Sequence, residues 1–168
     1  MNFENIFKAN LENSNEIARL VKNGWNAAYK GLIADEYLEN MNEDKMAINW
    51  KESIKKEESM IYVYKDDNEI LGVIRFGKAE DTSLKNVGEV LVLYIKPEEK
   101  RKGIGTKLFT FAKNELIKQG YKEMVIWCLK GNMQGINFYK KMGGKHIGER
   151  EYEIRGIKIM EEGFKYII

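Results

Sequence analysis

The sequence predicts an α/β (or α+β) protein with a mixed, twisted sheet of about seven strands and helices on both faces. Three observations predict this fold. Apolar runs rich in branched and aromatic residues recur at strand length, and other stretches repeat apolar residues at steps of three and four, as amphipathic helices do. In the middle of the chain a strand, a helix and a strand follow one another, the order of a parallel crossover. A length of 168 residues suits one domain over residues 1–168.

The first part of the chain predicts one strand and one long helix. Residues 3–9 are expected to form the strand. Asn13 is expected to cap the helix, with Glu16 completing a capping box three residues later. Gly31 ends this helical region. The helix carries one apolar stripe, formed by Ile17, Leu20, Val21, Trp25 and Ala28.

Two further helices and a hairpin come next. Residues 35–38 predict a short helix and residues 44–56 a longer one. Residues 59–65 and 70–77 predict strands, joined by the polar segment 66–69, which has the composition of a hairpin turn. An antiparallel meander therefore begins here.

The stretch from Glu89 to Leu116 organises the centre of the chain. Residues 87–95 predict a buried strand, and Pro97 stops it because proline cannot donate a ladder hydrogen bond. Residues 103–119 predict a helix with one apolar face, closed by Gly120. Residues 122–128 predict the next strand, parallel to the first, so the helix between them covers the sheet.

The last part of the chain predicts a helix and a pair of strands. Residues 132–142 read as the helix, and Gly143 and Gly144 break it. Residues 145–154 and 157–168 alternate like two strands about a turn at 155–156. The apolar end, residues 164–168, is a candidate edge for pairing with a second copy in a homodimer.

Composition narrows the class of protein. The net charge of +2 gives no reason to expect a nucleic-acid partner, but residues 1–60 are mainly acidic and residues 96–122 mainly basic. This distribution suits a cationic acceptor and an anionic cofactor. The single cysteine, Cys128, excludes an internal disulfide and is expected in the core. No apolar stretch has the length of a membrane span or a signal peptide, so we expect a cytoplasmic protein that does not bind membranes.

The turn before the central helix has the chemistry of an anion site. Gly103 and Gly105 let the backbone approach a ligand at the first helical turn, whose N–H groups have no internal partner. Lys100, Arg101 and Lys102 add positive charge beside the helix dipole. A phosphate-bearing ligand is the natural occupant of such a turn, and a solvated basic turn that contains two glycines is the alternative.

Two motifs now stand in order after successive strands. They are Lys100-x-x-Gly103-x-Gly105 and Asn132-x-x-Gly135-x-x-Phe138-Tyr139-x-Lys141-x-Gly143-Gly144. Together they resemble the pyrophosphate loop and the Asn…Phe-Tyr segment of the GNAT superfamily of acyl-CoA N-acyltransferases. The chain departs from that family where Lys100 replaces Gln or Arg, Gly135 replaces Ala and Gly144 replaces Phe. Lysine keeps the charge at residue 100 but loses the planar fork of arginine.

The resemblance implies a mostly antiparallel GNAT-like sheet and a cytoplasmic N-acetyltransferase that uses acetyl-CoA as co-substrate, without a metal. It also implies that the fourth and fifth strands splay apart and that the arm of coenzyme A lies between them like an added strand. Cofactor contacts are expected from the fourth strand, the loop, the first turn of its helix and the Asn…Tyr segment. The residues are Leu93, Tyr94, Ile95, Lys100, Arg101, Lys102, Gly103, Ile104, Gly105, Thr106, Asn132 and Tyr139.

Two residues are the candidate catalytic groups. Tyr139 is the candidate acid toward the leaving sulfur, because an ordinary phenol and an ordinary thiol differ in pKa by only about 1.5 units, or roughly 2 kcal/mol. Glu89 is the candidate base that takes a proton from the acceptor amine. A strand amide near Leu93 is expected to stabilise the carbonyl oxygen of the thioester. The alternatives are a packing role for Tyr139 and a solvated Glu89.

The acceptor is expected to be a small-molecule or peptide amine. Trp25 and Tyr29 are candidates to line its pocket, although aromatics at helical spacing commonly belong to the core. Asp35 and Glu36 are candidates to bind a cationic acceptor, with surface charge as the alternative. His146, the only histidine, is expected to be structural.

Other functions fit the sequence less well. Leu108 occupies the third glycine position of a dinucleotide fingerprint, and no Gly-Lys-Ser/Thr ending of a P-loop follows Gly103. No spacing of residues predicts a metal site or a covalent acyl-enzyme. The remaining alternative to the enzyme is a non-catalytic sensor that binds acyl-CoA on the same fold.

Overall fold

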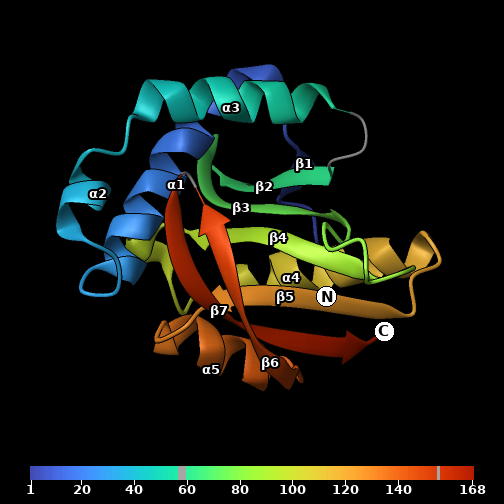
Figure 1. The fold of residues 1–168 in the computed structure, drawn as a ribbon. Coiled ribbons are helices and arrows are strands. Elements are labelled where there is room, and N and C mark those ends of the chain that lie inside the picture. The colour runs from blue at the N-terminus through green and yellow to red at the C-terminus, as the bar shows by residue number, and fades with distance from the viewer. Residues whose placement is uncertain (57–59, 155) are drawn as a thin grey trace.

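The computed structural model describes residues 1–56, 60–154 and 156–168, and seven strands within them form one sheet in the order β1-β2-β3-β4-β5-β7-β6 (Figure 1). The strands are β1 (Ile6–Lys8), β2 (Met60–Asp66), β3 (Glu69–Lys78), β4 (Gly88–Ile95), β5 (Glu123–Leu129), β6 (Lys145–Ile154) and β7 (Ile157–Ile167). The helices are α1 (Ser14–Tyr29), α2 (Asp35–Glu39), α3 (Glu43–Lys55), α4 (Ile104–Lys118) and α5 (Met133–Lys141). Only β4 and β5 run parallel, so the sheet is mixed and mostly antiparallel, as predicted.

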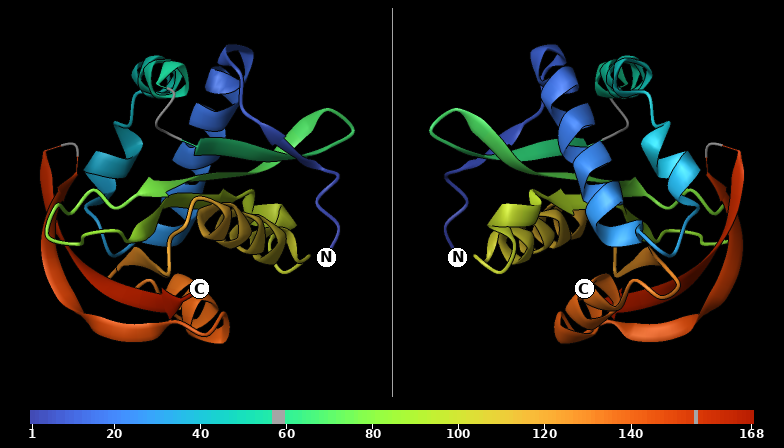
Figure 2. Two further views of the ribbon diagram at one scale, coloured as in Figure 1. Left: turned by 90° about the vertical axis from the view of Figure 1, so that its right-hand side faces the viewer. Right: turned by 90° about the vertical axis from the view of Figure 1, so that its left-hand side faces the viewer.

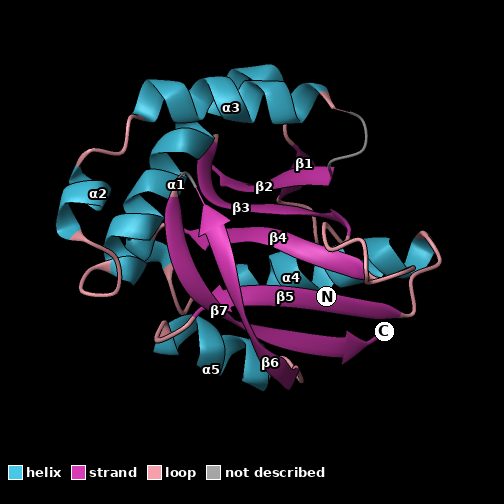
Figure 3. Cartoon of the chain, viewed as in Figure 1, coloured by secondary structure: helices cyan, strands magenta, loops and turns pink. Residues whose placement is uncertain are grey.

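Helices cover both faces of the sheet (Figures 2 and 3), and a large apolar core lies under the helices on each face. One core lies under α1 and α3 and includes Trp25, Trp50 and Val73. The other lies under α4 and α5 and includes Phe76, Leu108 and Tyr139. Side chains of β3 alternate between the two cores because successive residues of a strand point to opposite faces.

Most element boundaries agree with the sequence to within one or two residues, and the predicted hairpin turn is present. Asp67 and Asn68 both have positive φ, as a two-residue hairpin loop with the twist of its strands requires. The predicted start of β2 at residue 59 lies outside the described residues. β1 is shorter than predicted and spans three residues.

One prediction about the first helix was wrong. Glu16 does not complete a capping box, because its carboxylate accepts the backbone N–H of Ile70 at 2.7 Å and ties α1 to β3. The capping box belongs instead to Asn10 and Asn13, one turn earlier.

β7 lies between β5 and β6, so residues 164 and 165 are paired on both sides. Among the described residues β6 pairs with β7 only as far as Lys165, so Tyr166 and Ile167 pair with β5 alone, and pairing of this end with a second copy stays a prediction.

The feature that creates the site is the separation of β4 from β5. The two strands pair only where Gly88, Glu89 and Val90 face Met124, Val125 and Ile126. From Leu91 to Ile95, β4 continues to pair with β3, but within the described ranges it has no strand partner on the side of β5. The splay that the resemblance implied is therefore present, and it leaves a run of backbone groups open to a ligand.

Candidate active site

Two cavities meet where β4 and β5 separate. The larger one has a volume of about 740 Å³ and runs between β4, β5, α5 and the loop before α4. Its walls include most of the residues predicted to hold the cofactor. These are Leu93, Tyr94, Ile95, Lys100, Arg101, Gly103, Gly105, Thr106, Asn132 and Tyr139.

The loop before α4 presents main-chain donors to the larger cavity. Gly103 caps the helix in the left-handed region, at a φ of +87°, and no side chain caps the first turn. The N–H groups of that turn therefore keep their capacity to bind an anion, with the positive end of the helix dipole behind them. A Cβ at Gly103 would meet no protein atom within 4 Å, so backbone conformation is the reason for glycine here.

Two of the predicted cofactor-binding residues near this loop do not line the larger cavity. The ammonium of Lys102 donates a hydrogen bond to the carboxylate of Glu99 at 2.9 Å, and Ile104 is buried in the core under α4.

Lys100 has a partner in the cavity wall that the sequence did not predict. Gln134 accepts a hydrogen bond from the Nζ of Lys100 at 2.9 Å, and Gln134 also lines the larger cavity. Partial burial lowers the pKa of Lys100. Lys100 and Arg101 thus supply the positive charge beside the uncapped turn.

Tyr139 lies on α5 and reaches the larger cavity from the core. The backbone carbonyl of Tyr139 accepts a hydrogen bond from the hydroxyl of Tyr166 at 2.9 Å, which fixes this part of the helix. Burial, together with the nearby Cys128, raises the pKa of the Tyr139 phenol well above its ordinary value. Complete proton transfer from Tyr139 to a thiolate would cost more than the sequence-based comparison with an ordinary phenol suggested. Tyr139 is better suited to donating a hydrogen bond.

Asn132 and Cys128 form the wall between β5 and α5. The side chain of Asn132 accepts the N–H of Gly135 at 3.2 Å, so the predicted helix cap is present. Its amide also lies 3.6 Å from the sulfur of Cys128. Burial raises the pKa of Cys128 to about 12, so the thiol stays neutral and unreactive. A Cβ at Gly135 would come within 2.9 Å of this sulfur, which explains glycine where the family pattern has alanine.

The smaller cavity has a volume of about 210 Å³ and lies on the side of α1 and the β6–β7 hairpin. Its walls are mainly aromatic and aliphatic, with five charged side chains among them. The lining residues are Val21, Trp25, Tyr29, Ile33, Trp50, Arg75, Glu80, Glu89, Val90, Leu91, Val92, Tyr94, Trp127, Leu129, Arg150, Tyr152, Ile154, Ile159 and Glu161.

Glu89 is the buried carboxylate of the smaller cavity. It is only 3% exposed, and it accepts the backbone N–H of Glu80 at 2.9 Å. Burial raises the pKa of Glu89, and this effect outweighs the opposing effects of that hydrogen bond and of Arg150. The alternative of a solvated Glu89 is therefore wrong. A buried carboxylate with a raised pKa is suited to taking up a proton.

A pair of tyrosines stands where the two cavities join. The hydroxyl groups of Tyr29 on α1 and Tyr94 on β4 lie 2.8 Å apart, and both residues line both cavities. Burial raises the pKa of Tyr29 to about 12. A Cβ at Gly24 would come within 2.7 Å of the Tyr94 ring, so glycine at this position lets α1 pack against it.

Two guanidinium–carboxylate pairs complete the smaller cavity, and the sequence alone did not reveal them. Arg150 donates to Glu161 at 2.9 Å, and Arg75 lies 3.6 Å from Glu80. The guanidinium of Arg150 also lies over the ring of Trp127, 4.1 Å from its centroid. Signals for both pairs existed. Arg75 interrupts an apolar strand, and a hairpin about residues 155–156 places Arg150 opposite Glu161.

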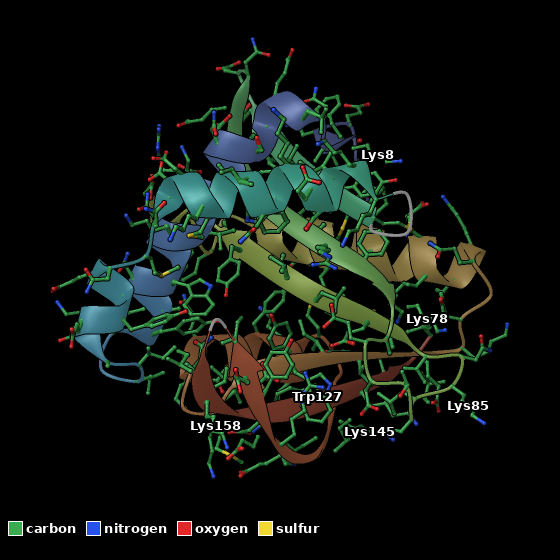
Figure 4. All side chains as sticks on the ribbon, turned by 45° about the horizontal axis from the view of Figure 1, so that its top comes forward. Lys8, Lys78, Lys85, Trp127, Lys145 and Lys158 are labelled. Atoms are coloured by element: carbon green, nitrogen blue, oxygen red, sulfur yellow. The ribbon has the colours of Figure 1, made fainter. Side chains whose placement is uncertain are left out.

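Trp127 lies at the centre of this arrangement. In Figure 4 it lies between β5 and the β6–β7 hairpin, whereas the labelled lysines Lys8, Lys78, Lys85, Lys145 and Lys158 lie on the periphery, where they are exposed. A Cβ at Gly163 would come within 2.6 Å of its ring, so a glycine in β7 makes room for the indole. The Nε1 of Trp127 and the Nε of Arg75 are buried without hydrogen-bond partners in the described part of the chain. Unpaired buried donors cost free energy and commonly mark functional sites.

Of the remaining predicted residues, two line the smaller cavity and the others line neither cavity. Trp25 and Tyr29 line the smaller cavity, as expected of an acceptor pocket. Asp35 and Glu36 are exposed on α2 and line neither cavity, so the geometry gives their predicted role in acceptor binding no support. His146 lies 3.6 Å from Glu162 and packs edge-on against Phe164, away from both cavities. Among the described residues, no three His, Cys, Asp or Glu side chains gather as metal ligands would.

This arrangement suits transfer of a group between two molecules. The larger cavity fits an extended anionic ligand, held by main-chain donors at the α4 end and by the open edge of β4. The smaller cavity fits a compact molecule that has a proton to lose. The two ligands would meet beside Tyr94 and Leu91, between a carboxylate on one side and a phenol on the other.

Comparison with known proteins points to one family of group-transfer enzymes. Residues 25–144 match the model of the acetyltransferase (GNAT) family. The uncharacterized N-acetyltransferase YuaI of Bacillus subtilis is 26% identical over 159 residues, covering 94% of this chain and 90% of YuaI. The spermidine N(1)-acetyltransferase of Thermoplasma acidophilum is 26% identical over 166 residues, covering 88% of this chain and 97% of that protein.

Solved structures share the fold. The PaiA N-acetyltransferase of Thermoplasma acidophilum, solved in complex with coenzyme A, aligns with a TM-score of 0.73 at 23% identity, over 94% of this chain and 96% of its own. An N-acetyltransferase of Staphylococcus aureus Mu50 aligns with a TM-score of 0.73 at 21% identity, over 96% of both chains. No helix among the described residues is long and apolar enough to cross a membrane.

Proposed function

This chain belongs to the GNAT family of N-acetyltransferases, and from that premise we propose that it moves an acetyl group from acetyl-CoA directly to a small primary amine. The observation that carries the proposal is the meeting of two cavities along the part of β4 that β5 leaves unpaired. One cavity has the donors for a diphosphate and the other has a buried carboxylate. Both ligands can therefore be bound at once, and no covalent acyl-enzyme is needed.

The larger cavity has residues that fit coenzyme A. The uncapped first turn of α4, with Lys100 and Arg101 beside it, would hold the diphosphate. The open edge of β4 from Leu91 to Ile95 would bind the amide groups of the pantetheine arm as an added strand does. When bound, acetyl-CoA supplies an activated thioester. Asn132 lies along the same wall, where its side chain is already fixed as the helix cap.

Glu89 would act as the general base. An amine is protonated at neutral pH and must lose a proton before it can attack. Burial raises the pKa of Glu89, which makes this carboxylate a better proton acceptor than an exposed one. The same burial favours pairing with an incoming ammonium, because a buried charge is strongly stabilised by a close opposite charge.

Tyr139 and the open strand edge would act on the other reacting atoms. As the bond from the amine nitrogen to the acetyl carbon forms and the carbon–sulfur bond breaks, negative charge passes to the carbonyl oxygen and then to the sulfur. A main-chain N–H near Leu93 would stabilise the oxygen. The Tyr139 hydroxyl would donate a hydrogen bond to the departing thiolate, and its raised pKa keeps the phenol protonated for that purpose.

An acceptor screen tests the proposal. Release of free thiol from acetyl-CoA is followed against a panel of monoamines, polyamines (including spermidine, the substrate named for the Thermoplasma relative), amino acids, peptides and aminoglycosides. Turnover on a member of this panel, with kcat/KM well above the rate without protein, is the expected result. Tight binding of acetyl-CoA in calorimetry with no turnover on any acceptor would favour the non-catalytic acyl-CoA sensor.

A further inference from the structure

The charges of the smaller cavity leave room for one cation. Its five charged side chains are two guanidinium groups and three carboxylates. Arg150 is paired with Glu161 at 2.9 Å, and Arg75 lies 3.6 Å from Glu80. Glu89 has only a backbone N–H as its hydrogen-bond partner among the described residues. Among the residues that the structure describes, one buried carboxylate is therefore left without a matching side-chain cation, and a single ammonium would balance it.

A second ammonium would find its best position already filled. An aromatic face with a carboxylate beside it is the preferred environment of an ammonium in a protein pocket. The smaller cavity has such a place, formed by the rings of Trp127 and Tyr152 and by Glu161. The guanidinium of Arg150 lies 4.1 Å from the centroid of the Trp127 ring and 4.8 Å from that of Tyr152.

The rest of the cavity favours an apolar body. Its volume of about 210 Å³ lies below the roughly 300–1,000 Å³ of common ligand pockets, so a folded peptide does not fit. Trp25 and Trp50 from the helices and Ile154 and Ile159 from the hairpin form much of its wall. Placing a charged group against these side chains would cost desolvation without a partner to offset it.

Resting on the proposed acetyl transfer, we infer that the acceptor is a small monoamine with an aromatic or aliphatic body. We further infer that Arg150, held by Glu161 over Trp127 and Tyr152, takes the position of a second ammonium and so excludes diamines and polyamines. Arg150 is thus a specificity-determining residue. The inferred acceptor differs from spermidine, which the name of the Thermoplasma relative gives as that protein's substrate.

A pair of acceptors with the same number of heavy atoms tests the inference. Pentylamine and 1,4-diaminobutane differ only in carrying a methyl or an ammonium group at the end away from the reacting amine. We expect kcat/KM for pentylamine to exceed that for 1,4-diaminobutane at least tenfold, and the same order in calorimetric titrations of the chain with coenzyme A present. A preference for the diamine in either measurement would overturn the inference.

Three variants assign the preference to Arg150. Arg150→Met removes the charge but keeps much of the length, and it leaves Glu161 free for an ammonium. We expect the tenfold preference to disappear or reverse. Adding Glu161→Gln restores the original charge balance, so the double variant should again favour pentylamine. Arg150→Lys keeps the charge and should keep the preference, which controls for lost packing.

The outcomes separate failure of the inference from failure of the proposed function. If Arg150→Met lowers kcat/KM for both acceptors equally and the double variant does no better, Arg150 has only a packing role and the inference is wrong. If the chain acetylates polyamines well but monoamines poorly, acetyl transfer stands and the inference fails. If no amine is acetylated, the proposed function fails, and stronger binding of the diamine in calorimetry would overturn the inference separately.

Discussion

The two cavities of this protein are built in different ways, although they meet beside the same tyrosines. The larger cavity offers a ligand mainly backbone groups, from the α4 turn at Gly103 and the open edge of β4. The smaller cavity is lined mainly by side chains, and these come from many elements. The elements include α1, α3, the strands β3 to β7 and the loop after β3. A backbone site depends on a few conformations, whereas a side-chain site depends on many identities. In the proposed function, the first would serve a common cofactor and the second would be adapted to one acceptor.

The largest expected effect belongs to the side-chain cavity. Glu89→Gln keeps the size and the acceptor of the Glu80 N–H but removes the base. We expect kcat to fall about a hundredfold or more, the usual contribution of a general base, with the affinity for acetyl-CoA unchanged. Steady-state thiol release and calorimetry measure the two quantities.

Glu80→Gln is the matched control for Glu89→Gln. Glu80 also lines the smaller cavity but is half exposed, and its side chain lies toward Arg75. Its substitution should alter kcat far less than that of Glu89. Equal losses in the two variants would show that cavity charge, and not proton transfer at Glu89, controls turnover.

The next prediction tests the backbone site with the two ends of one helix. Gly103 and Gly120 flank α4, have φ values of +87° and +91°, and have no atom within 4 Å of an added Cβ. Valine at either position forces a left-handed conformation that costs about 1 to 2 kcal/mol. Stability should fall similarly in both variants. Only Gly103→Val should also weaken acetyl-CoA binding, by about tenfold, because only that end faces the larger cavity.

Thermal unfolding and calorimetric titration distinguish the two effects in the glycine variants. A loss of affinity shared by Gly120→Val would mean that general loosening of α4 is responsible. Unaltered affinity in Gly103→Val would place the diphosphate elsewhere. The α4 turn would then not be the backbone site for the cofactor.

Tyr139→Phe removes only a hydroxyl, so we expect it to affect turnover alone and not stability. Since burial keeps this phenol protonated, its proposed role is a hydrogen bond to the leaving sulfur, and we expect kcat to fall about tenfold with little change in acetyl-CoA affinity. In the parent protein, kcat should not fall near pH 10, where an ordinary phenol ionises. The pH profile of the variant should therefore have the same shape. Unchanged kcat would leave Tyr139 with its packing role alone.

The difference between the cavities also explains what the sequence could predict. The glycines and the Asn…Tyr segment lie close together in the chain, so the anion turn and the strand–helix–strand order around it could be predicted from the residues. The separation of β4 from β5 was expected only from the family resemblance. Arg75, Arg150 and Glu161 come from three strands, and strand alternation alone did not say which face of the sheet they share. Glu16 was misassigned for the same reason, because its partner Ile70 is distant in sequence. The raised pKa of Glu89 depends on burial, which only packing creates.

The smallest expected effect is on stability, and it follows from the burial of Glu89. Its pKa is higher in the folded protein than in an unfolded chain, so the folded state binds more protons over the pH range between the two values. The stability associated with this group is therefore fully present below the unfolded pKa and is lost as pH rises through the folded one. Glu89→Gln removes the ionisation, so the variant does not lose this stability. Its free energy of unfolding should therefore rise relative to that of the parent as pH rises from 4 to 8. Urea unfolding of both proteins across this range measures the difference, and a constant difference would mean that Glu89 ionises as an exposed carboxylate does.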